Sequence, residues 1–573
     1  MIRAARALVL FVGCAFAVPA QGAAPLPVAN ARALVVSPHP VVTEAGVEML
    51  RAGGNAVDAA VAAAFALAVA QPQSTGIGGG GFLLVRLADG RAFAIDARET
   101  APAAATPDLY TRPGVPENAS LVGGLAVGTP GLVAGLALAL AAHGTLPLAR
   151  VLEPAIRLAE HGYEVGPYQA RYIADLEQRG VGAHLPELAR VHFPPGPIDA
   201  RTRIVQTDLA RTLRTIAAQG PSAFYEGPIA DAIAQAVKEH GGILTAGDLA
   251  RYRPVVRAPL VGHYRGYEVL AFPPPSSGGV TLLEILNVLE GFELAKLGAG
   301  SSAAIHRIAE AMKLAFADRA VYLGDPDFAE LPVAALLDPA YAARQRARID
   351  PAWWRRAPWT WGQGERAIRV TGPGLPPQDA GTAHLSVADA AGNAVALTET
   401  INTPYGSLVM VPGTGILLND EMDDFATRPG QPNAFGLVAL AGANGVAADK
   451  RPLSSMAPLI VLKDGKLRFV AGSNGGPRII TTTLLATLNH LDFGMDVSEA
   501  VAAPRFHHQW LPDELLLEAG NPADVVRALE ARGHTVKVMD DLGGGVEAIA
   551  RDPATGLLTG GVDPRRDGLA AGP

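Results

Sequence analysis

Cysteine is nearly absent from the sequence. Cys14 is the single cysteine among 573 residues, and it lies in an apolar N-terminal segment that has the character of a removable signal. Once that segment is removed, the chain holds no thiol. Disulfide bonds, thiolate catalysis and cysteine–zinc sites are therefore excluded from the mature protein.

Metal-binding and cofactor-binding motifs are also lacking. No His-Glu-x-x-His motif is present, so we expect neither a metal nor a cofactor. His507 and His508 are adjacent, and on a strand they would face opposite sides, which favours structural roles. The 47 basic residues are outnumbered by 55 acidic ones, and the net charge of −8 without a basic stripe argues against a nucleic-acid partner.

Residues 1–24 are typical of a secretory signal peptide. Arg3 and Arg6 precede an apolar run at 7–18, and small residues follow it. This run is short for a membrane-spanning helix, so we expect its cleavage and a periplasmic or secreted protein without stable membrane insertion. A second apolar run, at 59–70, is also too short to span a bilayer. It is predicted to be a buried helix capped by Asn55.

The remaining chain has the composition of a large globular protein. Hydrophobic residues make up 49% of it and charged residues 18%, which excludes a disordered or linker-dominated chain. Further helices are predicted at 42–52, 149–161, 305–322 and 478–490, and strands at 82–87, 92–97, 382–389, 394–400, 457–462 and 466–471. Tryptophan, proline and arginine crowd residues 338–379 without a period. Such a long irregular connection is expected to be mobile or functional.

Two glycine-rich stretches are candidate loops of a site. The run 74–81 contains G-x-G-x-x-G, but a helix precedes it and a strand follows it, which is the reverse of a dinucleotide-binding fingerprint. A tight backbone turn is favoured there, with a ligand-contacting loop as the alternative. Residues 471–475 approach a nucleophile elbow but begin with alanine, which disfavours Ser473 as a nucleophile. Gly475 and Gly476 are better suited to present backbone N–H groups to an oxyanion.

The strands at 382–389 and 394–400 are predicted to form a hairpin. A three-residue loop, 390–392, with Gly392 in the left-handed position is a favoured hairpin type. In that register Thr382 lies opposite Thr400, with the two side chains on one face. A two-residue loop would separate them. Threonine pairs across strands are common and usually inert, so the pattern alone leaves both a structural and a catalytic pair open.

Three acids in four residues form a further candidate site. Glu421, Asp423 and Asp424 could together bind a cation or an ammonium group. A solvated loop is the alternative, and calcium would require more alternating oxygen ligands.

Taken together, these stretches resemble the γ-glutamyltransferase family, also called γ-glutamyl transpeptidases. The resemblance extends from about residue 34 to residue 567. The matching motifs lie at 53–59, 78–82, 96–99, 381–384, 402–403, 419–425, 451–456, 472–476 and 503–510. Each motif is weak alone, but their order is that of the family.

The resemblance implies an α+β fold, the four-layer αββα sandwich of N-terminal-nucleophile hydrolases, formed jointly by two fragments of one precursor. It implies self-cleavage between Gly381 and Thr382 into a large subunit, 25–381, with a mobile end at about 338–381, and a small catalytic subunit, 382–573. Cleavage would free an α-amino group with a reference pKa near 8. That amine can serve as the base for the Thr382 hydroxyl.

The family's site residues carry over to matching positions in this sequence. Thr400 is expected to support Thr382, and Gly475 and Gly476 to face the oxyanion. Arg98, Ser454 and Ser455 match the clamp on the α-carboxylate of a γ-glutamyl group, and Asn402, Glu421 and Asp424 match the groups that receive its ammonium. The implied substrates are glutathione and other γ-glutamyl compounds, with water, amino acids or peptides as acceptors.

Three alternatives to this activity remain open at the level of sequence. A related acylase would remove glutaryl from another amine, a second relative would act on poly-γ-glutamate, and a non-catalytic protein would only bind γ-glutamyl compounds. Residues 429–440 resemble the lid loop of bacterial members of the family. Phe435 stands where tyrosine is often found, so the loss of a hydroxyl could weaken lid closure and alter the balance of hydrolysis and transfer.

Overall fold

Strands from both ends of the chain alternate within two stacked sheets. The computed structural model describes residues 26–194, 196, 198, 201–349, 367, 368, 370, 381–440 and 442–573. The predicted signal peptide lies outside these residues, and so does most of the predicted mobile segment 338–381. The part of that segment up to residue 349 is described and contains helix α16 (Pro339–Ile349).

The first sheet has seven antiparallel strands and contains the predicted hairpin at its centre. Its strand order is β21 (Leu569–Ala571), β2 (Ala33–Ser37), β10 (Gly381–Asp389), β11 (Ala394–Asn402), β3 (Gly80–Arg86), β4 (Ala92–Ala97) and β7 (Val255–Arg257). The hairpin β10–β11 thus lies between two strands that precede it by hundreds of residues. Strand β10 therefore begins with the predicted cleavage point in the middle of the sheet rather than at its edge.

The second sheet packs face to face on the first. Its order is β1 (Val28–Asn30), β20 (Leu558–Val562), β19 (Val546–Arg551), β15 (Lys466–Ser473), β14 (Leu459–Lys463), β9 (Tyr267–Ala271) and β8 (Leu260–Tyr264). His384, on the inner face of β10, projects toward β15, where a side chain on Gly472 would overlap its ring. Glycine at 472 therefore allows the two sheets to approach each other at this point.

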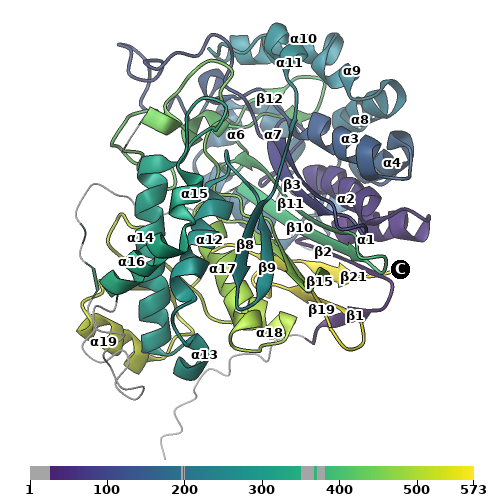
Figure 1. The fold of residues 1–573 in the computed structure, drawn as a ribbon. Helices are drawn as coiled ribbons and strands as arrows, with labels where there is room; N and C mark the ends of the chain where they lie inside the picture. Colours follow the sequence, from purple (N-terminus) through teal and green to yellow (C-terminus); the bar gives the residue numbers. More distant parts are fainter. Residues whose placement is uncertain are drawn as a thin grey trace, which may run out of the picture.

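Helices cover the outer face of each sheet and complete four layers (Figure 1). Over the first sheet lie α1 (Pro40–Arg51), α2 (Ala56–Ala70), α3 (Leu132–His143) and α4 (Leu148–His161). Over the second lie α12 (Ser277–Leu289), α14 (Ser302–Tyr322), α17 (Arg478–Leu491) and α18 (Val497–Ala502). The predicted αββα sandwich is confirmed.

Helix α2 is the predicted buried helix. All fifteen of its residues are buried, and Asn55 forms a capping box with Asp58. The Asp58 carboxylate also accepts hydrogen bonds from the backbone N–H groups of Thr145 and Leu146, so the charge is satisfied inside the protein. Leu385 and Val387 on β10 pack in the same apolar cluster as α2, which fixes the opposite face of β10 toward the second sheet.

The predicted helices and strands occur, with shifts of a few residues at their ends. The predicted helix 305–322 begins earlier, at Ser302, because Ser301 caps it by accepting a hydrogen bond from the backbone N–H of Ala304. The helix predicted at 42–52 begins at Pro40, which suits the first helical turn.

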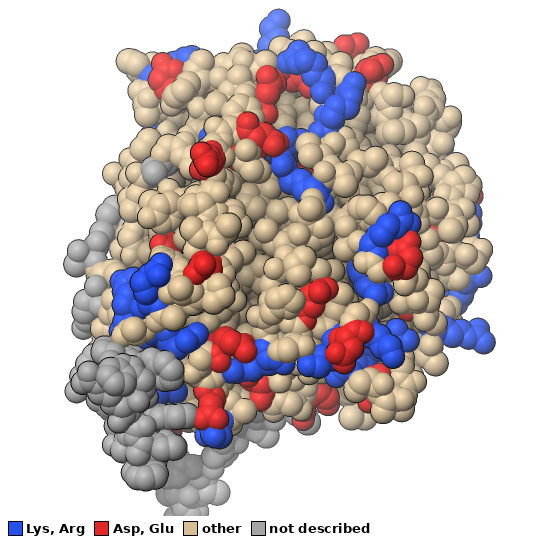
Figure 2. Space-filling model, in the orientation of Figure 1, with Lys and Arg blue, Asp and Glu red and all other residues tan. Residues whose placement is uncertain are grey.

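The surface is mixed in charge. On the face in Figure 2, basic and acidic side chains are interspersed among uncharged residues. Among the described residues, no helix is long and apolar enough to span a membrane.

Candidate active site

The hairpin places two threonine hydroxyls side by side, as its sequence predicts. Thr382 pairs with Thr400 in the β10–β11 register, and their Oγ1 atoms are 3.0 Å apart. Gly392 in the connecting loop has a φ of +98°, the left-handed conformation that the three-residue loop requires. Neither hydroxyl is exposed to bulk water, since both residues are buried.

The contacts of Thr400 assign the direction of the hydrogen bond between the two threonines. Thr400 Oγ1 donates its one hydrogen to the carbonyl oxygen of Gly381 at 2.7 Å and accepts the backbone N–H of Asn402 at 2.8 Å. Because that hydrogen is already used, Thr382 must donate to Thr400. Thr400 thus forms hydrogen bonds with both the carbonyl of Gly381 and the hydroxyl of Thr382.

The backbone at the Gly381–Thr382 junction is irregular and crowded. The strand register shifts between these two residues, and Asn402 opposite them has a φ of +79°. A Cβ on Gly381 would lie 2.5 Å from the carbonyl oxygen of Thr403 and 2.8 Å from that of Gln73. Only glycine fits at this position without a shift of the surrounding backbone.

The glycine run 74–81 supports the hairpin from the neighbouring strand. A Cβ on Gly79 would overlap the carbonyl oxygen of Thr400, so the two backbones are in close contact. This close packing agrees with the favoured interpretation of the run as a tight backbone element.

A pocket opens beside the two threonines and holds almost every predicted site residue. It is a small cavity of about 20 Å³, lined by Arg98, Thr382, Thr400, Asn402, Glu421, Asp424, Phe435, Ser454, Ser455, Met456, Gly476 and Ile479. Gly475 is absent from this lining but directly precedes Gly476. Residues from five distant stretches of the sequence therefore meet at one place.

The charged residues of the pocket pair with one another. The Arg98 guanidinium donates to the carboxylates of Glu421 and Asp424, and its Nε donates to the carbonyl oxygen of Pro452 at 3.1 Å. The sequence assigned Arg98 to a ligand carboxylate and the two acids to a ligand ammonium. In the structure these two halves of the expected ligand site neutralise each other.

Burial and mutual repulsion raise the proton affinity of the acids. The pKa of Glu421 is raised to about 7, mainly because the carboxylate is buried. The positive charge of Arg98 acts in the opposite direction but does not cancel this effect. Burial likewise raises the pKa of Asp424 and brings that of Asp423 to about 6. Burial alone would lower the pKa of Arg98, but Glu421, Asp424 and Glu99 outweigh it and raise that pKa, so Arg98 stays charged.

The serine pair forms another wall of the pocket, and a further arginine contacts Ser455. Ser454 Oγ accepts the backbone N–H of Met456 at 3.1 Å, and Ser455 Oγ accepts from Arg319 Nη2 at 3.3 Å. Arg319 on α14 is buried, and burial lowers its pKa to about 10 while Asp424 opposes that shift. The sequence analysis did not single out Arg319, because within an ordinary helical pattern nothing distinguishes it from a surface arginine.

The loop between β15 and α17 contains two glycines with positive φ. Gly475 and Gly476 have φ values of +115° and +60°, which favour glycine. Ser473, disfavoured as a nucleophile, donates its hydroxyl to the carbonyl oxygen of Asn474 at 2.9 Å and does not line the pocket. Gly476 therefore reaches the pocket through its backbone, as an oxyanion donor would.

The two adjacent histidines have separate buried partners. His507 bonds to Thr481 and Gln509, and His508 bonds to Asp513 and to the backbone N–H of Trp510. These contacts agree with the structural roles favoured from the sequence.

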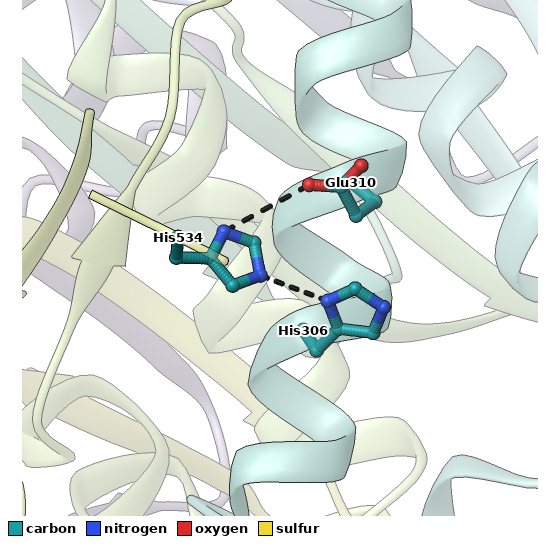
Figure 3. A group of neighbouring side chains, drawn as sticks. All are labelled: His306, Glu310 and His534. Carbon is teal, nitrogen blue, oxygen red and sulfur yellow. Dashed lines mark hydrogen bonds and ion pairs between the residues drawn. The ribbon is translucent and has the colours of Figure 1, made fainter. Parts of the chain in front are cut away.

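A different histidine group, missed by the sequence analysis, has atoms placed where a metal could be held (Figure 3). His306 and Glu310 lie one turn apart on α14, and His534 meets them, with His306 Nδ1 2.8 Å from His534 Nε2. Lys313 Nζ, however, is 3.1 Å from Glu310 Oε1 and 2.8 Å from Asp513 Oδ1. An ammonium group already balances these acids, so the group does not require a metal.

An αββα sandwich in which Gly381 and Thr382 begin the central strand β10, with Thr382 and Gly476 lining one pocket, is the architecture of an N-terminal-nucleophile hydrolase. The sequence profile of the family described as Gamma-glutamyltranspeptidase matches residues 42–573, and the chain belongs to this family.

Individual relatives include both hydrolases and acylases. The chain is 45% identical over 550 residues to a glutathione hydrolase proenzyme of Escherichia coli, covering 95% of this chain and 93% of the relative. It is 43% identical to an acylase ACY 1 proenzyme of Pseudomonas sp. strain SE83, covering 95% and 94%. The crystal structure of a cephalosporin acylase from Bacillus halodurans superimposes with a TM-score of 0.83 at 31% identity, covering 98% and 99% of the two chains.

Proposed function

We propose that this protein is a γ-glutamyl hydrolase and transferase that acts on glutathione or related γ-glutamyl compounds. The single observation that carries the proposal is the contact set of Thr400, whose hydroxyl bonds both the Gly381 carbonyl and the Thr382 hydroxyl. This arrangement serves a self-cleaving precursor, and the related glutathione hydrolase proenzymes support it.

Self-cleavage proceeds by attack of Thr382 on the preceding peptide bond. The Thr382 oxygen adds to the Gly381 carbonyl carbon, whose oxygen is held by Thr400, and the C–N bond then breaks. The peptide nitrogen takes up the hydroxyl proton and becomes the free amine of Thr382. Water hydrolyses the resulting ester and releases the Gly381 carboxylate. The products are fragments 25–381 and 382–573, which stay together as a heterodimer.

The same hydroxyl then acts on substrate with the new amine as its base. Thr382 attacks the γ-amide carbonyl, the backbone N–H at Gly476, with its neighbour Gly475, stabilises the oxyanion, and the amine product leaves with a proton. A γ-glutamyl ester remains on Thr382. Water or the amino group of an amino acid or peptide takes the acyl group from the ester in the second step.

Donor binding exchanges internal ion pairs for pairs with the ligand. The ligand's α-carboxylate replaces the internal acids as the ion-pair partner of Arg98 and forms hydrogen bonds with Ser454 and Ser455. Its ammonium takes over Glu421 and Asp424, assisted by Asn402. A zwitterion satisfies both charges at once, whereas a ligand with one charge leaves a buried group without a counter-charge.

An acylase that removes glutaryl is the second candidate, since two curated relatives at 43% identity carry the name acylase. Arg98 suits a glutaryl carboxylate equally well. The pair Glu421 and Asp424 favours the γ-glutamyl compound, because glutaryl brings no ammonium to them.

The protein is further proposed to be exported. Residues 1–24 supply the signal, and the mature enzyme would act in the periplasm or outside the cell. Edman sequencing of the exported protein tests this, since a mature N-terminus still at Met1 would reject export by signal cleavage.

The deciding experiment is intact mass spectrometry of the purified protein, followed by turnover with γ-glutamyl-p-nitroanilide and glutaryl-p-nitroanilide. Two fragments, one beginning at Thr382, with preference for the γ-glutamyl compound support the proposal. Two fragments with a preference for glutaryl would select the acylase, and a chain that stays uncut would reject the precursor mechanism.

A further inference from the structure

The lid-like loop at 429–440 contributes Phe435 to the pocket lining. An isolated antiparallel β-bridge between Pro432 and Val438 joins the two sides of the loop. Within the loop, Asn433 Oδ1 accepts hydrogen bonds from the backbone N–H groups of Phe435 and Leu437 at 3.0 and 3.1 Å. Phe435 is buried, lines the pocket and has its ring against Gly476. The loop tip therefore covers the oxyanion turn directly.

Contacts from two sides hold the loop tip. The backbone N–H of Ala434 donates to Asp423 Oδ2 at 2.9 Å, on the side of the acidic cluster. On another side, Gln509 Nε2 donates to the carbonyl oxygen of Phe435 at 3.1 Å. Neither contact uses the Phe435 side chain, so the position of the tip does not depend on a hydroxyl there.

Gln509 has all its polar atoms committed, which fixes its orientation. Nε2 also donates to the carbonyl oxygen of Leu511 at 3.3 Å, and because carbonyls only accept, the amide nitrogen must face both of them. Its Oε1 then accepts from His507 Nε2 at 2.9 Å. His507 must carry its proton on Nε2, so its Nδ1 accepts from Thr481 Oγ1 at 2.8 Å.

This chain of bonds links the lid to the catalytic machinery. Thr481 lies in the first turn of α17, the helix that follows the oxyanion turn directly. Thr481, His507 and Gln509 are all buried, so water cannot replace a lost bond easily. Burial also lowers the pKa of His507 to about 3, which agrees with a neutral ring that donates from one nitrogen and accepts at the other.

We propose that Gln509 is the latch that holds the lid loop 429–440 closed over the γ-glutamyl site, and that His507 is the positioning residue that aims it. The inference rests on the proposed function. The lid is then held by the hydrogen bond from Gln509 to the backbone carbonyl of Phe435. The bonds from Gln509 through His507 to Thr481 fix the position of the lid relative to α17 and the oxyanion turn.

The test is Gln509→Met, which keeps the length of the side chain but removes its amide. We expect the KM for a γ-glutamyl donor to rise about 10-fold, equivalent to about 1.4 kcal/mol, while kcat changes less than threefold. Hydrogen–deuterium exchange in 429–440 should become faster in the protein without substrate. Gln206→Met is the matched control, because Gln206 is equally buried and donates to the carbonyl oxygen of Val69 at 2.7 Å on the other side of the fold.

The role of His507 is tested separately. His507→Phe removes the donor to Gln509 and should reproduce the effect on KM, and the double variant should be no worse than Gln509→Met alone, because both changes break one path. His507→Gln retains an N–H donor and should recover most of the affinity. If Gln509→Met does not fold, Gln509→Asn shortens the same contact and should raise KM.

Two results would overturn the latch: unchanged exchange in 429–440 with unchanged KM in Gln509→Met, or an equal rise in KM in Gln206→Met. Exchange without substrate keeps the test separate from the activity. Faster exchange in a protein that does not turn over γ-glutamyl compounds would support the latch and count against the proposed function.

Discussion

The hydroxyl of Thr382 donates to that of Thr400, 3.0 Å away, and Thr400 in turn donates to the Gly381 carbonyl. Thr400 thus holds both the attacking hydroxyl and the carbonyl that it attacks, and both groups belong to strand β10. The hydroxyl that attacks and the carbonyl that receives it come from neighbouring residues, so no second molecule has to be positioned for the first turnover.

Replacing the attacking hydroxyl should stop both maturation and activity. Thr382→Ala is expected to remain a single chain without turnover, whereas Thr382→Ser should still divide into two fragments. Intact mass spectrometry measures the outcome, and a Thr382→Ala protein that still forms two fragments would eliminate Thr382 as the nucleophile.

Thr400→Val keeps the shape of the side chain but removes the hydrogen-bond donor to the Gly381 carbonyl. We expect self-cleavage to slow on the order of 100-fold, the typical effect of losing one donor to a developing oxyanion. A time course of fragment formation by gel electrophoresis checks this. A rate within twofold of the unmodified protein would show that Thr400 is a structural partner only.

Gly381→Ala should also slow cleavage, for a steric reason. The added Cβ would lie 2.5 Å from the Thr403 carbonyl oxygen and force the junction out of its position. Gly442→Ala is the control, because no atom lies within 4 Å of a Cβ there. The same time course compares the two, and equal rates would contradict the crowding at Gly381.

Asp424→Ala should separate the two candidate substrates. Removing this acid takes away a partner of the ligand ammonium, so turnover of γ-glutamyl-p-nitroanilide should fall by at least 10-fold more than that of glutaryl-p-nitroanilide. Matched kcat/KM measurements decide the point. Equal losses on both substrates would argue against contact between Asp424 and the ammonium.

The acids give the donor site a pH dependence of known sign. The pKa of Glu421 is raised to about 7, so this carboxylate is ionised above that pH and neutral below it. Since an ionised acid is needed to hold the ammonium, kcat/KM should decrease as the pH falls below about 7. The free amine of Thr382 also has to lose a proton, which adds a second step near pH 8.

Glu421→Gln distinguishes these two steps, because glutamine does not titrate. In this variant, kcat/KM should still change near pH 8, where the Thr382 amine titrates, but should no longer change near pH 7. A pH profile of kcat/KM identical to that of the unmodified enzyme would assign the lower step to Asp424 or Asp423, whose pKa values are also raised.

Local chemistry predicted the central hairpin well. The glycine at 392 and the alternation of the flanking residues predicted the register of Thr382 and Thr400 for a three-residue loop, because a hairpin brings together residues that are close in sequence. Helix ends were less accurate, since caps such as Ser301 stand outside the apolar periodicity on which the prediction depended.

The remainder of the site could not be deduced from local patterns. Arg98, Glu421 and Ser454 belong to segments separated by dozens to hundreds of residues, and only the family resemblance predicted that they share a pocket. Arg319 and Gln509 were missed because their roles depend on what packs against them. Gln509 lies in the family motif at 503–510, but local sequence indicates neither its bond to a distant carbonyl nor the burial of Arg319.

The alternation of strands from before and after residue 381 has a consequence for the finished enzyme. In the first sheet β10 and β11 lie between β2 and β3, and in the second β14, β15, β19 and β20 lie between β9 and β1. Cleavage of one peptide bond leaves the hydrogen bonds between all paired strands intact. The two pieces can therefore separate only if the strand pairing in both sheets is broken. Neither piece contains all the strands of either seven-stranded sheet, so pieces made separately would each lack the partner strands that complete it. The peptide bond between Gly381 and Thr382 is thus needed while the two sheets form, and it is no longer needed once they have formed.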